Sequence, residues 1–342
     1  MKTRAFIVML IVAALAVMSL APVAAQDEPL RVAAIAPSAT NDLAFSQSMF
    51  DALNLVQAEM GEDAFEFEFV EGIFIVDDAA VTLREWAASG EFDIVIAHGS
   101  QFGSIVEELA SEFPEVSFAW GTDFNTFGLD NVYAYEAASD QGGYINGVVA
   151  ANLTESNVMG VVGPIEVGDA KLYVDGFAYG AQVTNPDIEV NITYINSFSD
   201  VPLATEAAET LVANGSDILT GTAQMVVGPI QVVKDNELLW FGTQSSQAEL
   251  SESAGVMFQI YRWDVILMDM IENRSTGQLG GETYELTLEN GGLEIEFNEN
   301  YELSEELMTL VDETIEGIIA GEIETLPMEE EMEEPVATDE AG

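Results

Sequence analysis

Short apolar runs alternate with longer amphipathic stretches along most of the chain. The first apolar run, 31–37, has the length of a buried strand, and residues 45–60 follow it with apolar side chains at helical spacing. The alternation then continues, so that strands are expected at 31–37, 66–70, 93–97, 116–120, 132–135, 158–162, 188–195, 217–220 and 238–241, and helices at 45–60, 79–88, 101–113, 142–153, 170–183, 203–213, 226–235 and 305–319. Strands joined by crossover helices run parallel, so the pattern predicts an α/β fold with doubly wound parallel sheets.

One segment of this pattern recurs later in the chain, which predicts two similar lobes. Residues 86–122 and 211–243 each contain a helix end, a glycine, an Asp-Ile strand start and a last strand that ends in Gly-Thr. Because sheets of this kind bind ligands at the carboxyl ends of their strands, we expect a ligand cleft between the lobes. The expected division is 26–136 with about 247–281 for lobe 1, and 137–246 with about 282–322 for lobe 2.

Both ends of the chain differ from the middle. Residues 1–25 carry Lys2 and Arg4 ahead of an apolar run, and the small residues before Gln26 are typical of a signal peptide cleaved after Ala25. An uncleaved membrane anchor is the alternative. Residues 327–342 are acidic and have little to bury, which predicts a disordered tail. We therefore expect an exported protein, in the periplasm or at the cell surface.

Charge and composition exclude several classes of partner. The 342 residues include 8 Lys and Arg against 61 Asp and Glu, a net charge of −53 that becomes −55 without Lys2 and Arg4. Nucleic acids and anionic membranes need clustered basic residues, so neither is expected as a partner, and phosphate ligands are disfavoured. We interpret the acidity as a surface suited to a saline habitat. The absence of cysteine excludes disulfides, thiolate metal sites and a lipid anchor on cysteine.

The sequence shows no pattern typical of catalysis. It holds a single histidine, no nucleophile elbow, no His-x-x-x-His, no EF-hand spacing, and neither a Walker motif nor a dinucleotide fingerprint. We therefore expect a binding protein and not an enzyme, with no catalytic residue, cofactor or metal site.

Two loops resemble those of the basic membrane protein (BMP) family of solute-binding proteins. Residues 41–48, Asn-Asp-Leu-Ala-Phe-Ser-Gln-Ser, resemble the family's first strand-to-helix loop, and 98–103 resemble its His-Gly-x-Gln-Phe-Gly loop. Similar segments follow at 186–187, 194–200 and 242–245, in order between about 31 and 277. The resemblance implies a periplasmic-binding-protein type I fold. It also implies binding of a purine nucleoside for ABC-type uptake. We therefore expect a monomer that closes on this ligand and presents it to an ABC permease.

The sequence departs from the family pattern at the positions that determine the ligand. Ser46 stands where Asn is common, and Gln244 and Ser246 stand where nucleoside binders keep acidic residues that hold ribose hydroxyls. No lysine lies near Arg262, where some relatives have one. A nucleoside is the leading ligand class, with a sensory subunit for another small molecule, or an exported nucleoside-processing enzyme, as alternatives.

The candidate ligand-binding residues lie in the loops after expected strands, and several have a structural alternative. They are Asp42, Phe45, Ser46, Gln47, His98, Asp123, Phe198, Thr222, Gln224, Gln244 and Arg262. Asp42 could bind ligand N–H groups or cap the following helix. Phe45 could stack on a base or pack into the core, and His98 could donate to the ligand or fix the Gly99 loop.

The remaining alternatives concern polar and charged side chains. Ser46 and Gln47 are neutral donors and acceptors, which suit an uncharged ligand. Asp123 could contact the ligand or belong to a turn. Arg262, at an expected strand end, could neutralise acids of the ligand or of the lobe, or lie along the acidic surface.

Overall fold

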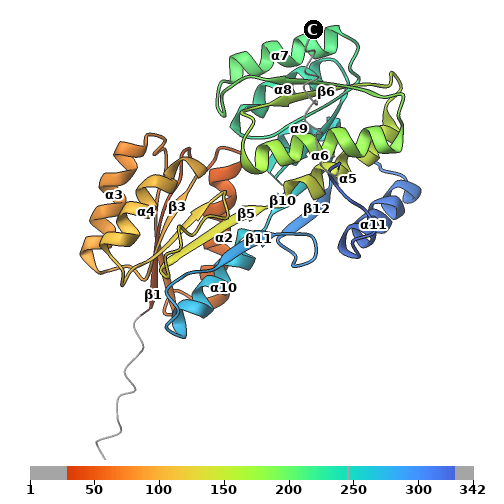
Figure 1. Cartoon of the computed structure of the whole chain (residues 1–342). Helices are drawn as coiled ribbons and strands as arrows, with labels where there is room; N and C mark the ends of the chain where they lie inside the picture. Colours follow the sequence, from red (N-terminus) through yellow and green to blue (C-terminus); the bar gives the residue numbers. More distant parts are fainter. Residues whose placement is uncertain (1–28, 245, 328–342) are drawn as a thin grey trace, which may run out of the picture.

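The computed structural model describes residues 29–244 and 246–327, which form two α/β lobes (Figure 1). The expected signal peptide at 1–25 and all but the first residue of the expected tail at 327–342 lie outside these residues. Within the described ranges, no helix is long and apolar enough to cross a membrane.

Lobe 1 is built on a parallel sheet of six strands in the order β11-β5-β4-β3-β1-β2. The strands are β1 (Leu30–Ile35), β2 (Phe65–Val70), β3 (Ile94–His98), β4 (Ser117–Gly121), β5 (Val132–Ala137) and β11 (Thr283–Leu286). Its helices are α2 (Phe45–Met60), α3 (Val76–Ser89), α4 (Gly103–Glu112) and α10 (Trp263–Ser275). Helices α2 and α10 pack on one face of the sheet and α3 and α4 on the other, so the sheet is buried on both sides.

Lobe 2 repeats this topology in the order β12-β10-β9-β8-β6-β7. Its strands are β6 (Val158–Gly163), β7 (Glu189–Tyr194), β8 (Ile218–Gly221), β9 (Leu239–Thr243), β10 (Gly255–Tyr261) and β12 (Leu293–Phe297), the last antiparallel to β10. Its helices are α5 (Ser139–Leu153), α6 (Gly168–Thr184), α7 (Val201–Ala213), α8 (Val227–Asp235), α9 (Ser246–Ser251) and α11 (Glu305–Ile319). The shared strand order confirms two doubly wound lobes, with β4 and β9 as the equivalent strands that end in Gly-Thr.

The chain crosses between the lobes after β5, after β10 and after β11. Two stretches lie in the opposite lobe from the expected one. Strand β10 pairs with β9 in the second sheet, although 247–281 was expected in lobe 1, and β11 pairs with β5 in the first sheet, although 282–322 was expected in lobe 2. The apolar run of β10 predicts a buried strand, but nothing local says which sheet it joins.

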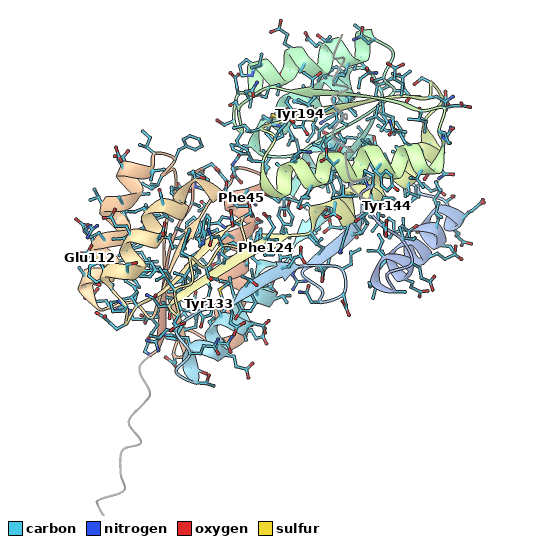
Figure 2. All side chains as sticks on the ribbon, in the orientation of Figure 1. Phe45, Glu112, Phe124, Tyr133, Tyr144 and Tyr194 are labelled. Atoms are coloured by element: carbon cyan, nitrogen blue, oxygen red, sulfur yellow. The ribbon has the colours of Figure 1, made fainter. Side chains whose placement is uncertain are left out.

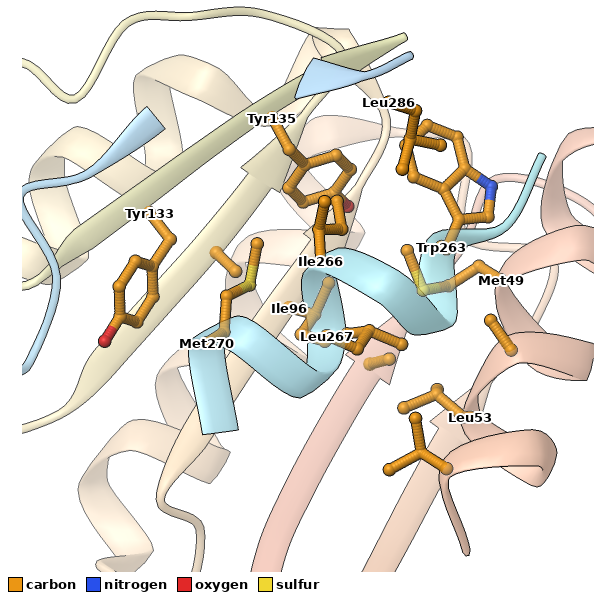
Figure 3. Packing of buried hydrophobic residues seen from close by; sticks show 14 of the residues in the cluster. Met49, Leu53, Ile96, Tyr133, Tyr135, Trp263, Ile266, Leu267, Met270 and Leu286 are labelled. Atoms are coloured by element: carbon orange, nitrogen blue, oxygen red, sulfur yellow. The ribbon is translucent and has the colours of Figure 1, made fainter. Parts of the chain in front are cut away.

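Helix α10 shows how the second crossing returns the chain to lobe 1. Trp263, Ile266, Leu267 and Met270 pack on the first sheet beside α2 (Figure 3). The indole N–H of Trp263 donates to Ser48 Oγ at 2.9 Å. Trp263, the residue after Arg262, thus anchors the second crossing to lobe 1.

Glycines let α5 and α6 pack at backbone contact in lobe 2 (Figure 1). A Cβ on Gly143 or Gly147 would lie 2.3 Å and 2.2 Å from the carbonyl oxygens of Tyr173 and Phe177. Gly176 and Gly180 approach α5 equally closely. This packing fixes the start of α6 against the crossing after β5.

Candidate functional site

A cavity of about 90 Å³ lies where the carboxyl ends of the two sheets face each other. It is lined by the loops after β1, β2, β3 and β4 of lobe 1 and after β6, β7, β8 and β9 of lobe 2, together with the end of β10. The lining residues are Pro37, Ser38, Ala44, Phe45, Phe74, Gly99, Ser100, Gln101, Thr122, Val167, Asp169, Ala170, Phe198, Ser199, Thr222, Ala223, Gln224, Thr243, Gln244 and Tyr261. This is the place where doubly wound sheets bind ligands.

Asp42 caps helix α2 and does not line the cavity. Its Oδ1 accepts from the backbone N–H groups of Ala44 at 2.9 Å and Gln47 at 3.1 Å, and its Oδ2 accepts from that of Ser46 at 3.2 Å. These N–H groups have no partner within the first turn of a helix, so the carboxylate satisfies them as a cap does. Of the two roles expected for Asp42, the structure therefore shows the capping of α2 and not a contact with the cavity.

Ser46 and Gln47 also hold the loop and lie outside the cavity lining. The buried Ser46 Oγ lies 2.7 Å from Ser38 Oγ, and Gln47 Oε1 accepts from the N–H of Leu43 at 3.0 Å. These two oxygens are therefore used inside the loop, and the Gln47 side chain also hydrogen-bonds Asp51 of α2, while Phe45 lines the cavity.

Phe45 lines the cavity from lobe 1, and His98 supports it from behind. The two rings stack at a centroid distance of 3.8 Å and an angle of 9°. His98 Nδ1 lies 2.9 Å from the hydroxyl of Tyr135 and Nε2 lies 3.2 Å from the carbonyl oxygen of Phe45. Burial lowers the pKa of His98 to about 3, so its imidazole stays neutral. His98 is outside the lining and has a structural place, beneath Phe45 and not in the Gly99 loop.

Lobe 2 places its expected residues around the same cavity: Phe198, Thr222, Gln224 and Gln244. Gln224 also bridges the lobes, since its Nε2 donates to Ser38 Oγ at 2.6 Å and to Asp42 Oδ2 at 3.2 Å. The Oγ1 of Thr222 lies 3.4 Å from that of Thr243. The cleft is thus spanned by side-chain hydrogen bonds.

Asp123 and Arg262 do not reach the cavity. Asp123 is exposed, and its Oδ1 accepts from the N–H of Asn125 at 2.8 Å, as in a turn. Arg262 donates to both carboxylate oxygens of Asp264 at 2.9 and 2.8 Å and to Glu294 at 2.6 Å. Arg262 therefore neutralises acids of the protein itself.

Sequence reasoning missed Asp169, which joins the two lobes at the cavity wall. It lies in the first turn of α6, where its Oδ1 accepts from Thr122 Oγ1 at 3.1 Å and its Oδ2 accepts from the hydroxyl of Tyr261 at 2.8 Å. Extending the expected two-lobe repeat beyond 86–122 and 211–243 could have found it, because the loop after β6 is the counterpart of the Asp42 loop after β1.

Glu136, at the end of β5, is buried near Asp169. Its Oε2 lies 3.7 Å from the position of a Cβ on Gly168, the residue before Asp169. Burial, and then the charge of Asp169, raise the pKa of Glu136 to about 9. Burial also raises the pKa of Asp169. Glu136 is therefore protonated at neutral pH, and the charge of the pair lies on Asp169, which has more hydrogen-bond donors.

Every basic side chain in the described ranges is paired on the surface. Six ion-pair groups account for them: Arg31 with Glu66, Arg84 with Glu108 and Glu112, Lys171 with Asp175, Lys234 with Glu252, Arg262 with Asp264 and Glu294, and Arg274 with Asp93. None of them lines the cavity. The wall thus offers aromatic rings, hydroxyls, amides and one carboxylate, a set suited to a neutral ligand.

Comparisons with known proteins agree with this architecture. A purine-binding protein of Brucella abortus is 26% identical over 260 residues, which cover 76% of this chain and 73% of the relative. The transcriptional activator protein Med of Bacillus subtilis is 23% identical over 266 residues, covering 78% and 81% of the two chains. An ABC transporter solute-binding protein of Conexibacter woesei has a solved structure that matches with a TM-score of 0.74 at 25% identity, covering 87% of this chain and 98% of that one.

The sequence model of one protein family extends over nearly all of the described residues. This family, Bmp, is described as ABC transporter substrate-binding protein PnrA-like, and it matches residues 30–331. The two-lobed periplasmic-binding-protein type I fold and the cavity between the lobes are those of such a protein. The chain belongs to the Bmp family of PnrA-like ABC transporter substrate-binding proteins.

Proposed function

We propose that this protein binds a purine nucleoside between its lobes, outside the cytoplasm, and delivers it as a monomer to an ABC permease. The observation that carries the proposal is a pair of phenylalanines, Phe45 of lobe 1 and Phe198 of lobe 2, that line one cavity. Stacking on an aromatic side chain stabilises a bound base by about 1–3 kcal/mol. Phe45 lies at the end of lobe 1 that faces lobe 2 (Figure 2).

Two amide groups in the wall support a ligand with both donors and acceptors. Gln101 Nε2 and Gln224 Oε1 are buried and have no hydrogen-bond partner within the protein. Both residues line the cavity. An unpaired buried polar atom is unfavourable by about 1–3 kcal/mol, so a ligand that pairs with both is favoured. The edge of a purine base carries such donors and acceptors.

Lobe closure provides the signal that a permease can read. A ligand shifts the lobes toward the closed form only if it binds that form more tightly than the open one. Contacts with Phe45 and with Phe198 or Gln224 are made together only when the lobes meet. A ligand held by both lobes therefore favours closure.

The proposal is tested by a thermal-shift screen of nucleosides, bases, sugars and amino acids in high salt, followed by calorimetry. Purine nucleosides should raise the melting temperature in proportion to the logarithm of their concentration. Phe45→Ala should then weaken binding by at least about tenfold, since the stacking partner is lost.

The matched control is Phe124→Ala, because Phe124 is exposed (49%) and outside the cavity lining (Figure 2). Phe45→Leu replaces Phe45→Ala if the alanine variant disturbs the fold of the loop after β1. A screen in which only sugars or amino acids stabilise the protein refutes the nucleoside proposal, and conversion of the bound compound would make the protein an enzyme.

A further inference from the structure

Asp169 differs in kind from every other residue of the cavity wall. It is the only described lining residue whose side chain is a carboxylate, and none of the described basic residues lines the cavity. It enters from lobe 2, whereas Phe45 enters from lobe 1. The cavity therefore presents one fixed acceptor with a negative charge.

The carboxylate of Asp169 is held in place from both lobes. Thr122 of lobe 1 donates to Oδ1, and Tyr261, at the crossing after β10, donates to Oδ2. Tyr261 is itself held by Ser139, whose Oγ lies 2.7 Å from its hydroxyl. Besides the two hydroxyls, the backbone N–H groups of Ala170 and of Asp169 itself donate toward the carboxylate, which lines the cavity as a fixed acceptor.

The backbone before Asp169 favours glycine. Gly168 has a φ of +49°, and a Cβ there would lie 2.8 Å from Thr122 Oγ1. This close approach brings the first turn of α6 against lobe 1. A ligand group that reaches this part of the wall therefore contacts the Asp169 carboxylate directly.

No cation neutralises this part of the wall. Neither Asp169 nor Glu136 takes part in any of the ion pairs formed within the described ranges. In a partly buried site a second negative charge is screened poorly, so an anionic ligand is repelled. A hydroxyl or N–H group is attracted, because hydrogen bonds to ionised acceptors are the stronger ones.

We propose that Asp169 determines specificity in this cavity: it accepts a hydrogen bond from a hydroxyl or N–H group of the ligand and excludes phosphorylated forms of the same compound. This assignment rests on the proposed nucleoside function. Asp169 thus provides an acidic acceptor in the first turn of α6, whereas Gln244, in the loop after β9, is neutral.

The experiment compares adenosine with adenosine 5′-monophosphate in isothermal titration calorimetry at fixed high salt and pH 7. The proteins are the wild type, Asp169→Asn and Glu166→Gln. The asparagine keeps the size of the side chain and removes its charge. Glu166 is exposed in the same loop and outside the cavity lining, so Glu166→Gln makes the same change in net charge away from the ligand.

Wild type and Glu166→Gln should bind adenosine and discriminate against the monophosphate by at least 100-fold. Asp169→Asn should bind adenosine at least tenfold more weakly and discriminate at least tenfold less. Asp169→Ser gives the same comparison if the asparagine variant does not fold. Unchanged affinity and discrimination in a folded Asp169 variant overturn the role of Asp169 alone. A wild type that binds neither compound overturns the nucleoside function and this assignment with it.

Discussion

Glu136 should make the protein less stable as the pH rises, and its replacement by glutamine should remove this effect. The side chain is 6% exposed at the end of β5, where the chain leaves lobe 1. Burial, followed by the charge of Asp169, raises its pKa from the ordinary 4.5 to about 9. Its Oε1 accepts from the N–H of Ala137 at 2.9 Å, a bond that the amide oxygen of glutamine can also accept.

The magnitude follows from the linkage between protonation and folding. The folded-state pKa is higher than the unfolded one, so the stability linked to this proton is fully present below pH 4.5 and is lost as the pH rises through 9. Each pH unit in that window changes the free energy of unfolding by about 1.4 kcal/mol. Glu136→Gln should therefore be more stable than the wild type by about 1 kcal/mol at pH 5 and about 3 kcal/mol at pH 7.

Urea unfolding of both proteins at pH 5, 6, 7 and 8 in one high-salt buffer measures this difference. The large net charge contributes its own pH dependence, which salt screens and which both proteins share. Glu166→Gln is the control, because it removes one exposed carboxylate from the neighbouring loop. Parallel curves for wild type and Glu136→Gln would show that Glu136 ionises in the folded protein near its ordinary pKa, contrary to our reasoning.

Two further predictions concern the packing of lobe 2 and the bridge between the lobes. Gly147→Ala should lower the free energy of unfolding, measured in urea, by about 1–3 kcal/mol or more, because its Cβ would lie 2.2 Å from the carbonyl oxygen of Phe177. An unchanged midpoint of urea unfolding would contradict the close packing of α5 and α6. Gln224→Ala should enlarge the radius of gyration measured by small-angle X-ray scattering, since it removes both hydrogen bonds to the loop after β1. An identical scattering curve would show that these bonds do not hold the lobes together.

Local patterns in the sequence predicted most elements up to β9 and helix α11, but not the elements between them or how the lobes share them. Helices α2 and α11 begin and end at the expected residues, because each is amphipathic over its whole length. Ser304 caps α11 as its type suggests, its Oγ accepting from the N–H of Leu307 at 3.3 Å. By contrast β11 pairs with β5, which lies far earlier in the sequence, and α10 was not expected at all. Pairing across such distances leaves no periodic signal.

The candidate site shows the same limit at the level of single side chains. Phe45, Phe198, Thr222, Gln224 and Gln244 reach the cavity because each follows a strand whose carboxyl end faces it. Asp42, Ser46 and Gln47 also follow a strand, but the first turn of α2 takes their polar atoms. Whether a polar side chain satisfies its own loop or faces the cleft depends on which backbone N–H groups lie beside it.

The two lobes share a topology but contribute different chemistry to the cleft. In lobe 1 the loop after β1 turns its carboxylate onto its own helix and presents an aromatic ring, Phe45. In lobe 2 the equivalent loop after β6 presents a carboxylate, Asp169, which Thr122 reaches from the other lobe. Because Phe45 lies in lobe 1 while Phe198 and Asp169 lie in lobe 2, a ligand that contacts all three gains these contacts together only in the closed form. Such a ligand binds the closed form more tightly than the open one, which is the condition for closure to report that the cavity is occupied.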